Sequence, residues 1–149
     1  MADIKSPAKR SRNMSAIKSK GTKPEEYIAK LLFARRYRYR KNSNSVAGHP
    51  DIWLAKYNTA VFVNGCFWHR HDCKYAYIPK SNTDFWNRKF TANINRDRAV
   101  RDTLRIENIK CLIIWECTIK SMKKEPLLEN SMIMRIEEFL KNGDLVLEL

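Results

Sequence analysis

The sequence predicts an α/β fold in which at least part of the sheet is parallel. Two short apolar runs, Thr59 to Val63 and Cys111 to Trp115, are typical of buried strands. Segments with helical signals precede, separate and follow them. Strands that alternate with helices favour a sheet with at least some parallel pairs and helices packed against it. A chain of 149 residues is long enough for one domain with a real core, and no internal repeat divides it.

The first predicted helix begins at a capping box. Thr22 stands at the N-cap, Pro24 follows near the start, and Glu25 occupies the third helical position. The apolar face of this helix would be formed by Ile28, Leu31 and Leu32.

Extended segments follow this helix. Tyr37 to Arg40 alternates aromatic and basic residues, which favours a strand with one face in water, and Ile52 to Leu54 predicts another strand. Thr83 is predicted to cap a long, Arg-rich helix that runs to about Asn108. A last amphipathic helix carries apolar residues at helical spacing: Leu127, Leu128, Met132, Ile136 and Phe139.

The N-terminal segment differs in composition from the rest. The first 23 residues are basic, Ser-rich and nearly free of acids, and such a segment does not fold alone. Met14 and Ile17 interrupt the charge, so part of it could form a short helix or insert an apolar group. We therefore expect a basic arm over residues 1–21 that orders on its partner, and a single domain over 22–149.

The charge balance indicates a polyanionic partner. Lys and Arg number 29 against 16 Asp and Glu, which gives a formal charge of +13. Nucleic acid is the leading partner because it would release counterions on binding such a surface. A membrane surface is the competing explanation, but we find no long apolar span or strongly amphipathic basic helix. The residues after Met1 form no apolar stretch, so nothing suggests that the protein is secreted. The four cysteines are therefore better interpreted as metal ligands or core residues than as disulfides.

The segment 65–75, Gly-Cys-Phe-Trp-His-Arg-His-Asp-Cys-Lys-Tyr, concentrates metal-binding side chains. Cys66, His69, His71 and Cys73 are all potential ligands of a tetrahedral Zn²⁺ ion, and Cys66, His71 and Cys73 can turn inward together. For the fourth ligand, Cys117 at a strand end is favoured over Cys111, whose apolar strand predicts a buried, inert thiol.

Three other side chains of this segment are then left for different work. His69 would be free to move a proton near neutral pH. Phe67 and Trp68 would be exposed on a rigid loop, where they could stack on bases or wedge between them. In the weaker alternative, these aromatic residues belong to the hydrophobic core and the cysteines bind no metal.

Asp51 is the acid most suggestive of catalysis. It follows Pro50 at the start of an apolar strand, where a carboxylate beside a neighbouring strand end could hold Mg²⁺ for phosphodiester hydrolysis. Composition alone would make it a turn residue. A catalytic role for Asp51 is favoured by its neighbourhood, because Asp51, Glu25 and His69 would converge if the helix and both strands pack together. For Glu25 itself, the capping role comes first.

The motifs taken together resemble the very-short-patch-repair (Vsr) DNA mismatch endonucleases. The resemblance covers nearly the whole chain, and its most specific parts are the Cys/His loop and the Trp-Glu-Cys sequence. The matching segments are Arg10-Ser-Arg-Asn-Met-Ser-Ala-Ile, Thr22 with Glu25, Gly48-His-Pro-Asp51, Gly65-Cys-Phe-Trp-His69 with His71 and Cys73, Phe85-Trp86 with Lys89, Asn93, Arg96-Asp-Arg98, and Trp115-Glu-Cys117.

The resemblance implies a restriction-endonuclease-like mixed sheet flanked by helices, with a zinc-pinned loop. It implies a strand-specific endonuclease that nicks double-stranded DNA at T:G mismatches left by deamination of 5-methylcytosine. A structural zinc would bind Cys66, His71, Cys73 and Cys117, and a catalytic Mg²⁺ would bind Asp51 and the Val63 carbonyl. His69 and Glu25 would assist Asp51. DNA would contact Met14, Phe67, Trp68, Trp86, Arg10, Arg12, Lys89 and Asn93, with the arm in the other groove.

The chain departs from the family pattern at a few positions. Val63 stands where the best-known members carry Thr, which matters little if the backbone carbonyl is the ligand. Asn64 replaces a histidine and cannot shuttle a proton, so acid–base work falls to His69. His49 replaces an arginine and could change local phosphate contacts. Arg70 and Asp72 interrupt a His-rich run, but neither is needed as a ligand.

Two other functions fit part of the pattern. A non-catalytic zinc module that binds DNA or RNA would explain the charge, aromatics and zinc, and an RNA-binding protein would prefer single strands without cleavage. Only Asp51, Val63 and His69 separate the endonuclease from both. The expected protein is a prokaryotic-type, cytoplasmic, nucleoid-associated monomer, with mismatch-repair proteins as candidate partners.

Overall fold

The computed structural model describes residues 21–149, and residues 1–20 lie outside the described part of the chain. The predicted DNA contacts Arg10, Arg12 and Met14 fall in that outer segment. Within residues 21–149, a five-stranded mixed sheet is combined with four α-helices and one short 3₁₀-helix, Ala55–Tyr57. The predicted α/β fold with a partly parallel sheet is confirmed.

The strands follow one another across the sheet in chain order. Antiparallel pairing joins β1 (Arg40–Lys41) to β2 (Ile52–Leu54) and β2 to β3 (Thr59–Asn64). Parallel pairing joins β3 to β4 (Lys110–Trp115) and β4 to β5 (Val146–Glu148). Parallel neighbours need long crossover connections, and these connections supply three of the four described α-helices.

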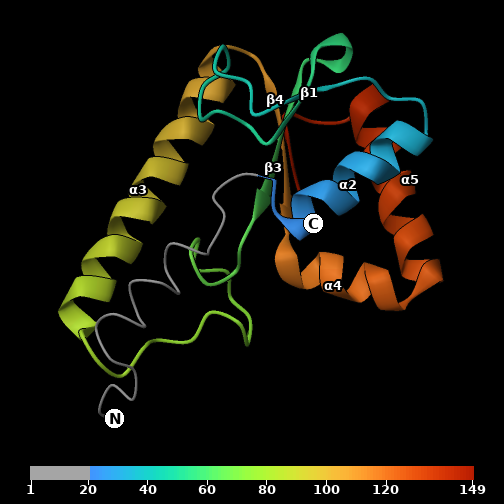
Figure 1. The fold of residues 1–149 in the computed structure, drawn as a ribbon. Coiled ribbons are helices and arrows are strands. Elements are labelled where there is room, and N and C mark those ends of the chain that lie inside the picture. The colour runs from blue at the N-terminus through green and yellow to red at the C-terminus, as the bar shows by residue number, and fades with distance from the viewer. Residues whose placement is uncertain (1–20) are drawn as a thin grey trace.

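The two crossovers run on opposite faces of the sheet. Helix α3 (Thr83–Ile106) connects β3 to β4 on one face, while α4 (Glu116–Lys124) and α5 (Pro126–Asn142) connect β4 to β5 on the other. Figure 1 shows α3 alone on one side, with α2 (Lys23–Ala34) beside α4 and α5 on the opposite side. The domain is therefore a three-layer arrangement with a buried central sheet.

Alternation along β4 separates the two cores. Leu112 and Ile114 pack with the side chains of α2, α4 and α5, whereas Cys111, Ile113 and Trp115 belong to the smaller core under α3. All five are at most 5% exposed. A strand buried on both faces reads as a continuous apolar run, which is why this strand was predictable from sequence.

Helix α2 confirms the predicted capping box. The Thr22 hydroxyl accepts from the Glu25 backbone N–H, and the Glu25 carboxylate accepts from the Thr22 N–H in return. Glu25 Oε2 also accepts from the Gly21 N–H at 2.6 Å. These bonds satisfy donors at the helix start and fix the Glu25 side chain.

Several predicted elements differ from the structure. The strand predicted over Tyr37 to Arg40 is reduced to Arg40–Lys41, because the Tyr37 ring turns into the core and its hydroxyl donates to Glu137. Helix α3 has Asn82 at its N-cap rather than Thr83. Helix α4 and strand β5 were not predicted. Among residues 21–149, no helix is both long and apolar enough to cross a membrane.

Candidate functional site

The Cys/His cluster forms where two parallel strands end. In the register of β3 and β4, Asn64 lies opposite Trp115, so the segments that follow leave the same edge of the sheet. Cys66 follows one strand and Cys117 follows the other. The ligand atoms of four side chains lie within 4.8 Å of one another, those of Cys66, His71, Cys73 and Cys117.

The contacts inside this cluster fit a tetrahedral metal site. Cys117 Sγ lies 3.4 Å from His71 Nδ1, and the Cys117 N–H donates to Cys66 Sγ at 3.4 Å. The His71 ring stacks on the Trp115 indole at 4.2 Å between centroids. Burial raises the pKa of the Cys66 thiol to about 12, so its thiolate requires a compensating cation. Three thiolates with one imidazole suit Zn²⁺.

Asp51 is held at the edge of β3 by its neighbour across the sheet. Its Oδ2 accepts a hydrogen bond from the Val63 N–H at 2.7 Å. The turn before it depends on Gly48, whose φ of +79° favours glycine. A Cβ there would lie 2.4 Å from Val100 Cγ1 on α3, so the turn can pack against this helix only without a side chain.

The Val63 carbonyl is available beside Asp51. The pairs Ile52–Val61 and Leu54–Thr59 set the β2–β3 register, and the next pair would place Pro50 opposite Val63. A proline has no N–H, so it cannot donate to this carbonyl. The Asp51 carboxylate and the Val63 carbonyl are therefore oxygen donors of the type that Mg²⁺ binds, and the residues present fit that ion.

Burial raises the pKa of Asp51 to about 7. The Val63 N–H opposes this shift by stabilising the ionised form, while the Glu25 carboxyl adds to it by charge repulsion and hydrogen bonding. Glu25 is itself only 8% exposed. The capping residue and Asp51 therefore share one site, and a buried carboxyl beside a half-buried one favours a bound cation.

His69 is paired with a carboxylate that our sequence analysis did not assign. Its Nδ1 lies 2.6 Å from Asp97 Oδ2, and both side chains are about 30% exposed, at 30% and 28%. Asp97 is part of the Arg96-Asp-Arg98 segment on α3. An acid among arginines on a helix usually pairs within that helix, so only the packing of α3 against the loop reveals this contact.

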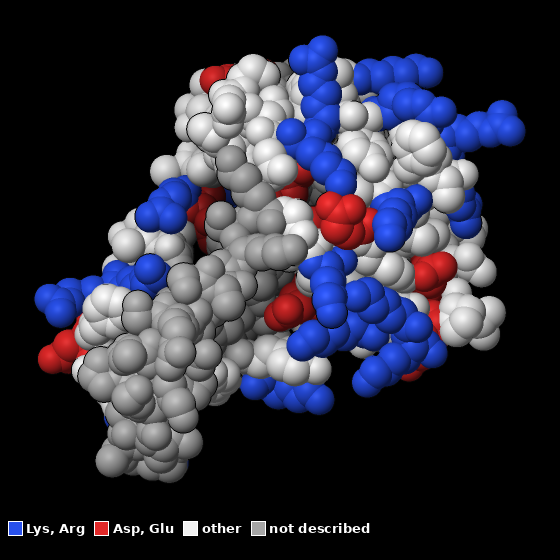
Figure 2. All heavy atoms as spheres, in the orientation of Figure 1, with Lys and Arg blue, Asp and Glu red and all other residues white. Residues whose placement is uncertain are grey.

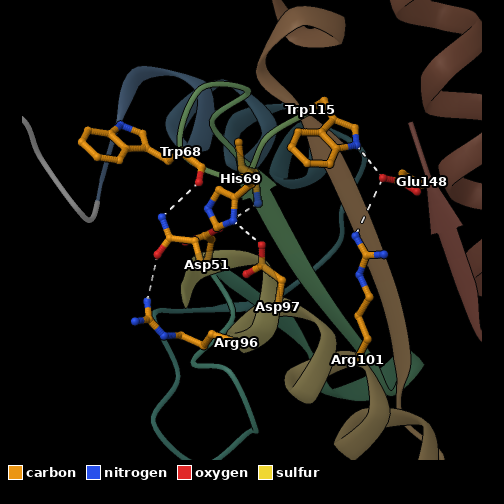
Figure 3. A network of polar contacts seen from close by, with 10 residues as sticks. Asp51, Trp68, His69, Arg96, Asp97, Arg101, Trp115 and Glu148 are labelled. Atoms are coloured by element: carbon orange, nitrogen blue, oxygen red, sulfur yellow. Dashed lines mark hydrogen bonds and ion pairs between the residues drawn. The ribbon is translucent and has the colours of Figure 1, made fainter. Parts of the chain in front are cut away.

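These groups line one cleft. Asp51, Glu25, His69 and Asp97 surround an open cavity of about 970 Å³ that also reaches Trp68 and Lys89. Figure 3 shows His69 with Asp97 beside it and Asp51 close by, and Trp68 pointing away toward the outside. The cleft can hold an extended anionic substrate with a carboxylate and an imidazole at its floor.

Phe67 lies at the centre of an aromatic cluster that we call the ring cluster. Its ring centroid is 5.0 to 5.4 Å from those of Trp68, Tyr77, Trp86 and Phe90. Both Phe67 and Trp68 are half-buried, so the expectation that they are exposed is wrong. The rings pack on one another because loop and α3 meet there, and this packing restricts their orientations.

Two polar side chains of α3 hold the Trp68 position. Asn93 Nδ2 donates to the Trp68 carbonyl at 3.0 Å, and Lys89 Nζ lies 5.7 Å from the centre of the Trp68 ring. Trp86 is half-buried within the same cluster, so it is neither plain core nor free. The predicted contact residues Trp68, Trp86, Lys89 and Asn93 are thus brought together.

Positive charge is spread over the surface. Figure 2 shows many Lys and Arg side chains on the side of the molecule that carries α2 and α4, with several acidic groups among them. On α4, the side chains of Lys120, Lys123 and Lys124 are exposed. This distribution suits a long polyanion that extends beyond the cleft.

A mixed sheet with helices on both faces, and a carboxylate and histidine in a cleft at its edge, fits the restriction-endonuclease-like α/β class. A family model described as DNA mismatch endonuclease Vsr matches residues 2–75. The DNA mismatch endonuclease Vsr of Escherichia coli is 36% identical over 142 residues, 94% of this chain and 88% of that protein.

Two nicking enzymes are also similar. The type II nicking enzyme V.NmeAIP of Neisseria meningitidis is 48% identical over 123 residues, 81% of this chain and 86% of its own. V.XorIIP of Xanthomonas oryzae is 35% identical over 122 residues, 82% of this chain and 90% of its own. The chain belongs to the Vsr DNA mismatch endonuclease family. It is therefore a DNA-cleaving hydrolase from a nuclease family that implies a divalent metal.

Proposed function

We propose that this protein nicks one strand of duplex DNA at T:G mismatches, which deamination of 5-methylcytosine leaves, and so begins very-short-patch repair. The observation that carries the proposal is the placement of Asp51 and His69 in one cleft beside the ring cluster. A relative whose name includes mismatch endonuclease, and others named as nicking enzymes, support it. A module that only binds nucleic acid would not need this pair of groups.

Asp51 and the Val63 carbonyl would hold the catalytic Mg²⁺, and Glu25 would add negative charge next to them. When bound, Mg²⁺ supplies charge neutralisation at a phosphate oxygen and makes water more acidic. The Val63 N–H fixes the orientation of the Asp51 carboxylate through Oδ2, and the neighbouring Glu25 carboxyl would share the cation with Asp51.

His69 would serve as the general base. Asp97 accepts from Nδ1, which fixes the tautomer and leaves Nε2 to take a proton from the attacking water. The Asp97 charge then stabilises the imidazolium that forms. Asn64 is only 7% exposed and has no group that titrates near neutral pH, so we assign no proton transfer to it.

The ring cluster would sense the mismatch. A T:G wobble pair stacks less well than a normal pair, so opening the base step beside it costs less, by roughly 1–3 kcal/mol. Phe67, Trp68 and Trp86 would enter that step, while Lys89 and Asn93 support it from α3. Arg10, Arg12 and Met14 of the arm would contact the other groove and add affinity that is blind to sequence.

The zinc would be structural. Four protein ligands leave no open position for water, so the cluster would pin the loop to the end of β4 rather than take part in hydrolysis. This keeps Phe67 and His69, which lie between the ligands Cys66 and His71, in fixed places.

The decisive assay uses duplexes that carry one T:G pair or a T:A pair at the same position, each strand labelled separately. With Mg²⁺ we expect a nick in one strand of the T:G duplex, and none when Ca²⁺ replaces Mg²⁺. Asp51→Ala should bind the T:G duplex normally and nick it at least ~100-fold more slowly. Binding without any cleavage by the wild-type protein would instead support the non-catalytic module.

A further inference from the structure

Arg70 occupies an unusual place behind the ring cluster. Residues 65–82 contain no helix or strand. Turn hydrogen bonds such as His69 N–H to the Gly65 carbonyl satisfy some of their backbone carbonyls, and the rest need other donors. The Cys/His cluster fixes this segment only as far as Cys73. The Arg70 side chain reaches residues beyond that point, and its backbone has a φ of +54°, which is disfavoured for a residue with a side chain.

The Arg70 guanidinium bonds three carbonyl oxygens at once. Its Nη1 donates to the carbonyls of Phe67 and Tyr77, each at 3.1 Å, and its Nη2 donates to the Ala76 carbonyl at 2.7 Å. The first carbonyl is that of Phe67, the residue whose ring lies at the centre of the ring cluster. The carbonyls of Ala76 and Tyr77 come after Cys73, the last cysteine of the loop. One side chain therefore ties both parts of the loop together.

The same guanidinium stacks on the aromatic rings. Its Cζ lies 3.9 Å from the centre of the Phe90 ring on α3 and 5.6 Å from that of Phe67. The Phe90 side chain is buried at 5% exposure. Loop and helix are thus held together by a planar cation that donates in its plane and stacks on its face, a combination that arginine provides and lysine does not.

We propose that Arg70 is a positioning residue that sets the orientation of Phe67 and Trp68 and thereby the selectivity for mismatched DNA. The inference rests on the proposed function, since selectivity requires that the ring cluster reads the mismatch. Arg70 acts through the Phe67 carbonyl, through Tyr77, whose ring centroid lies 5.0 Å from that of Phe67, and through Phe90. It is neither a metal ligand nor a group that touches the reacting phosphate.

The test compares Arg70→Lys with Arg105→Lys. Both changes keep the charge, but Arg105 is exposed on α3 and pairs with Asp102 within the same helix. Three quantities are measured: zinc per protein, amide hydrogen exchange over residues 74–90, and binding to T:G and T:A duplexes with Ca²⁺ in place of Mg²⁺. For Arg70→Lys we expect full zinc, faster exchange around Tyr77, and a T:G over T:A preference reduced roughly tenfold, with T:A binding unchanged.

Other results would overturn the inference. Wild-type exchange and wild-type preference in Arg70→Lys would show that the guanidinium contacts do not matter. Faster exchange with an unchanged preference would make Arg70 a tether without a role in selectivity. Loss of zinc would mean that it acts through the metal cluster. If the wild-type protein itself has no T:G preference, the proposed function fails, and so does the selectivity role, whereas the exchange data still report whether Arg70 orders the loop.

Discussion

The His69 and Asp97 side chains are separated by 28 residues in the chain and by 2.6 Å between Nδ1 and Oδ2. The pair joins the Cys/His loop to helix α3, the two elements that also build the ring cluster. A change at Asp97 should therefore affect proton transfer without removing a ligand of either metal.

We expect Asp97→Asn to nick a T:G duplex at least ~10-fold more slowly than the wild type, because the amide can donate to Nδ1 and so favour the wrong tautomer. His69→Ala should lose roughly 100-fold or more. Both variants should keep their zinc and their affinity for the duplex, measured with Ca²⁺. Zinc loss in His69→Ala would mean that the roles of His69 and His71 are exchanged.

The parts of the fold that sequence predicted are those with a strong local signal. Helix α2 carries its own capping box, and β4 is a continuous apolar run that needs no partner to be recognised. Strand β5 was missed because Val146–Glu148 is short and mostly exposed, and only its pairing with β4 defines it. Helix α4 was missed because it buries only Ile119 and Met122.

The residues of the site also differ in how far sequence could predict them. The Cys/His cluster could be predicted because three of its residues lie close together in sequence and the fourth closely follows an evident strand. Asp97 and Arg70 could not be, because their contacts depend on how α3 packs against a loop that has no regular structure. Side chains of common surface types gain a role only through such long-range packing.

The cysteines should separate by role. Cys117→Ser should lower zinc content and stability, because it removes one ligand and leaves the others around an incomplete site. Cys111→Ala should keep full zinc, since Cys111 lies in the core under α3, outside the cluster. Metal analysis and thermal unfolding of the two variants test this. Full zinc in Cys117→Ser, or none in the wild type, would refute the ligand assignment.

Asp51 should reduce stability at neutral pH in protein without added Mg²⁺. Its pKa is about 7 in the folded protein and near 3.8 when unfolded, so below the lower value the carboxyl is protonated in both states. As the pH rises from the lower value toward 7, the Asp51 carboxyl ionises in the unfolded chain but stays mostly protonated in the folded protein. The free energy of unfolding therefore falls over this range. An asparagine at this position keeps the protonated shape and can still accept from the Val63 N–H.

We therefore expect Asp51→Asn to be more stable than wild type at pH 8 by on the order of 1–3 kcal/mol, with little difference near pH 4. Urea unfolding across this range, without added Mg²⁺, measures it. Added Mg²⁺ should stabilise the wild type at pH 8 and have less effect on Asp51→Asn. Parallel pH curves for the two proteins would contradict the buried ionisation of Asp51.

Trp68 should contribute selectivity rather than general affinity. Its ring lies in the cluster with Phe67 and Trp86, while its backbone carbonyl is held by Asn93, so truncating the ring leaves that anchor in place. Trp68→Ala should reduce the preference for T:G over T:A by roughly 10-fold, on the scale of one lost base–aromatic stack, with T:A binding barely changed.

Phe33→Ala is the matched control, because Phe33 is 57% exposed and lies on α2, outside the ring cluster. Equal losses on both duplexes would indicate that the rings only support the fold, and base stacking by Trp68 would be excluded as the source of selectivity.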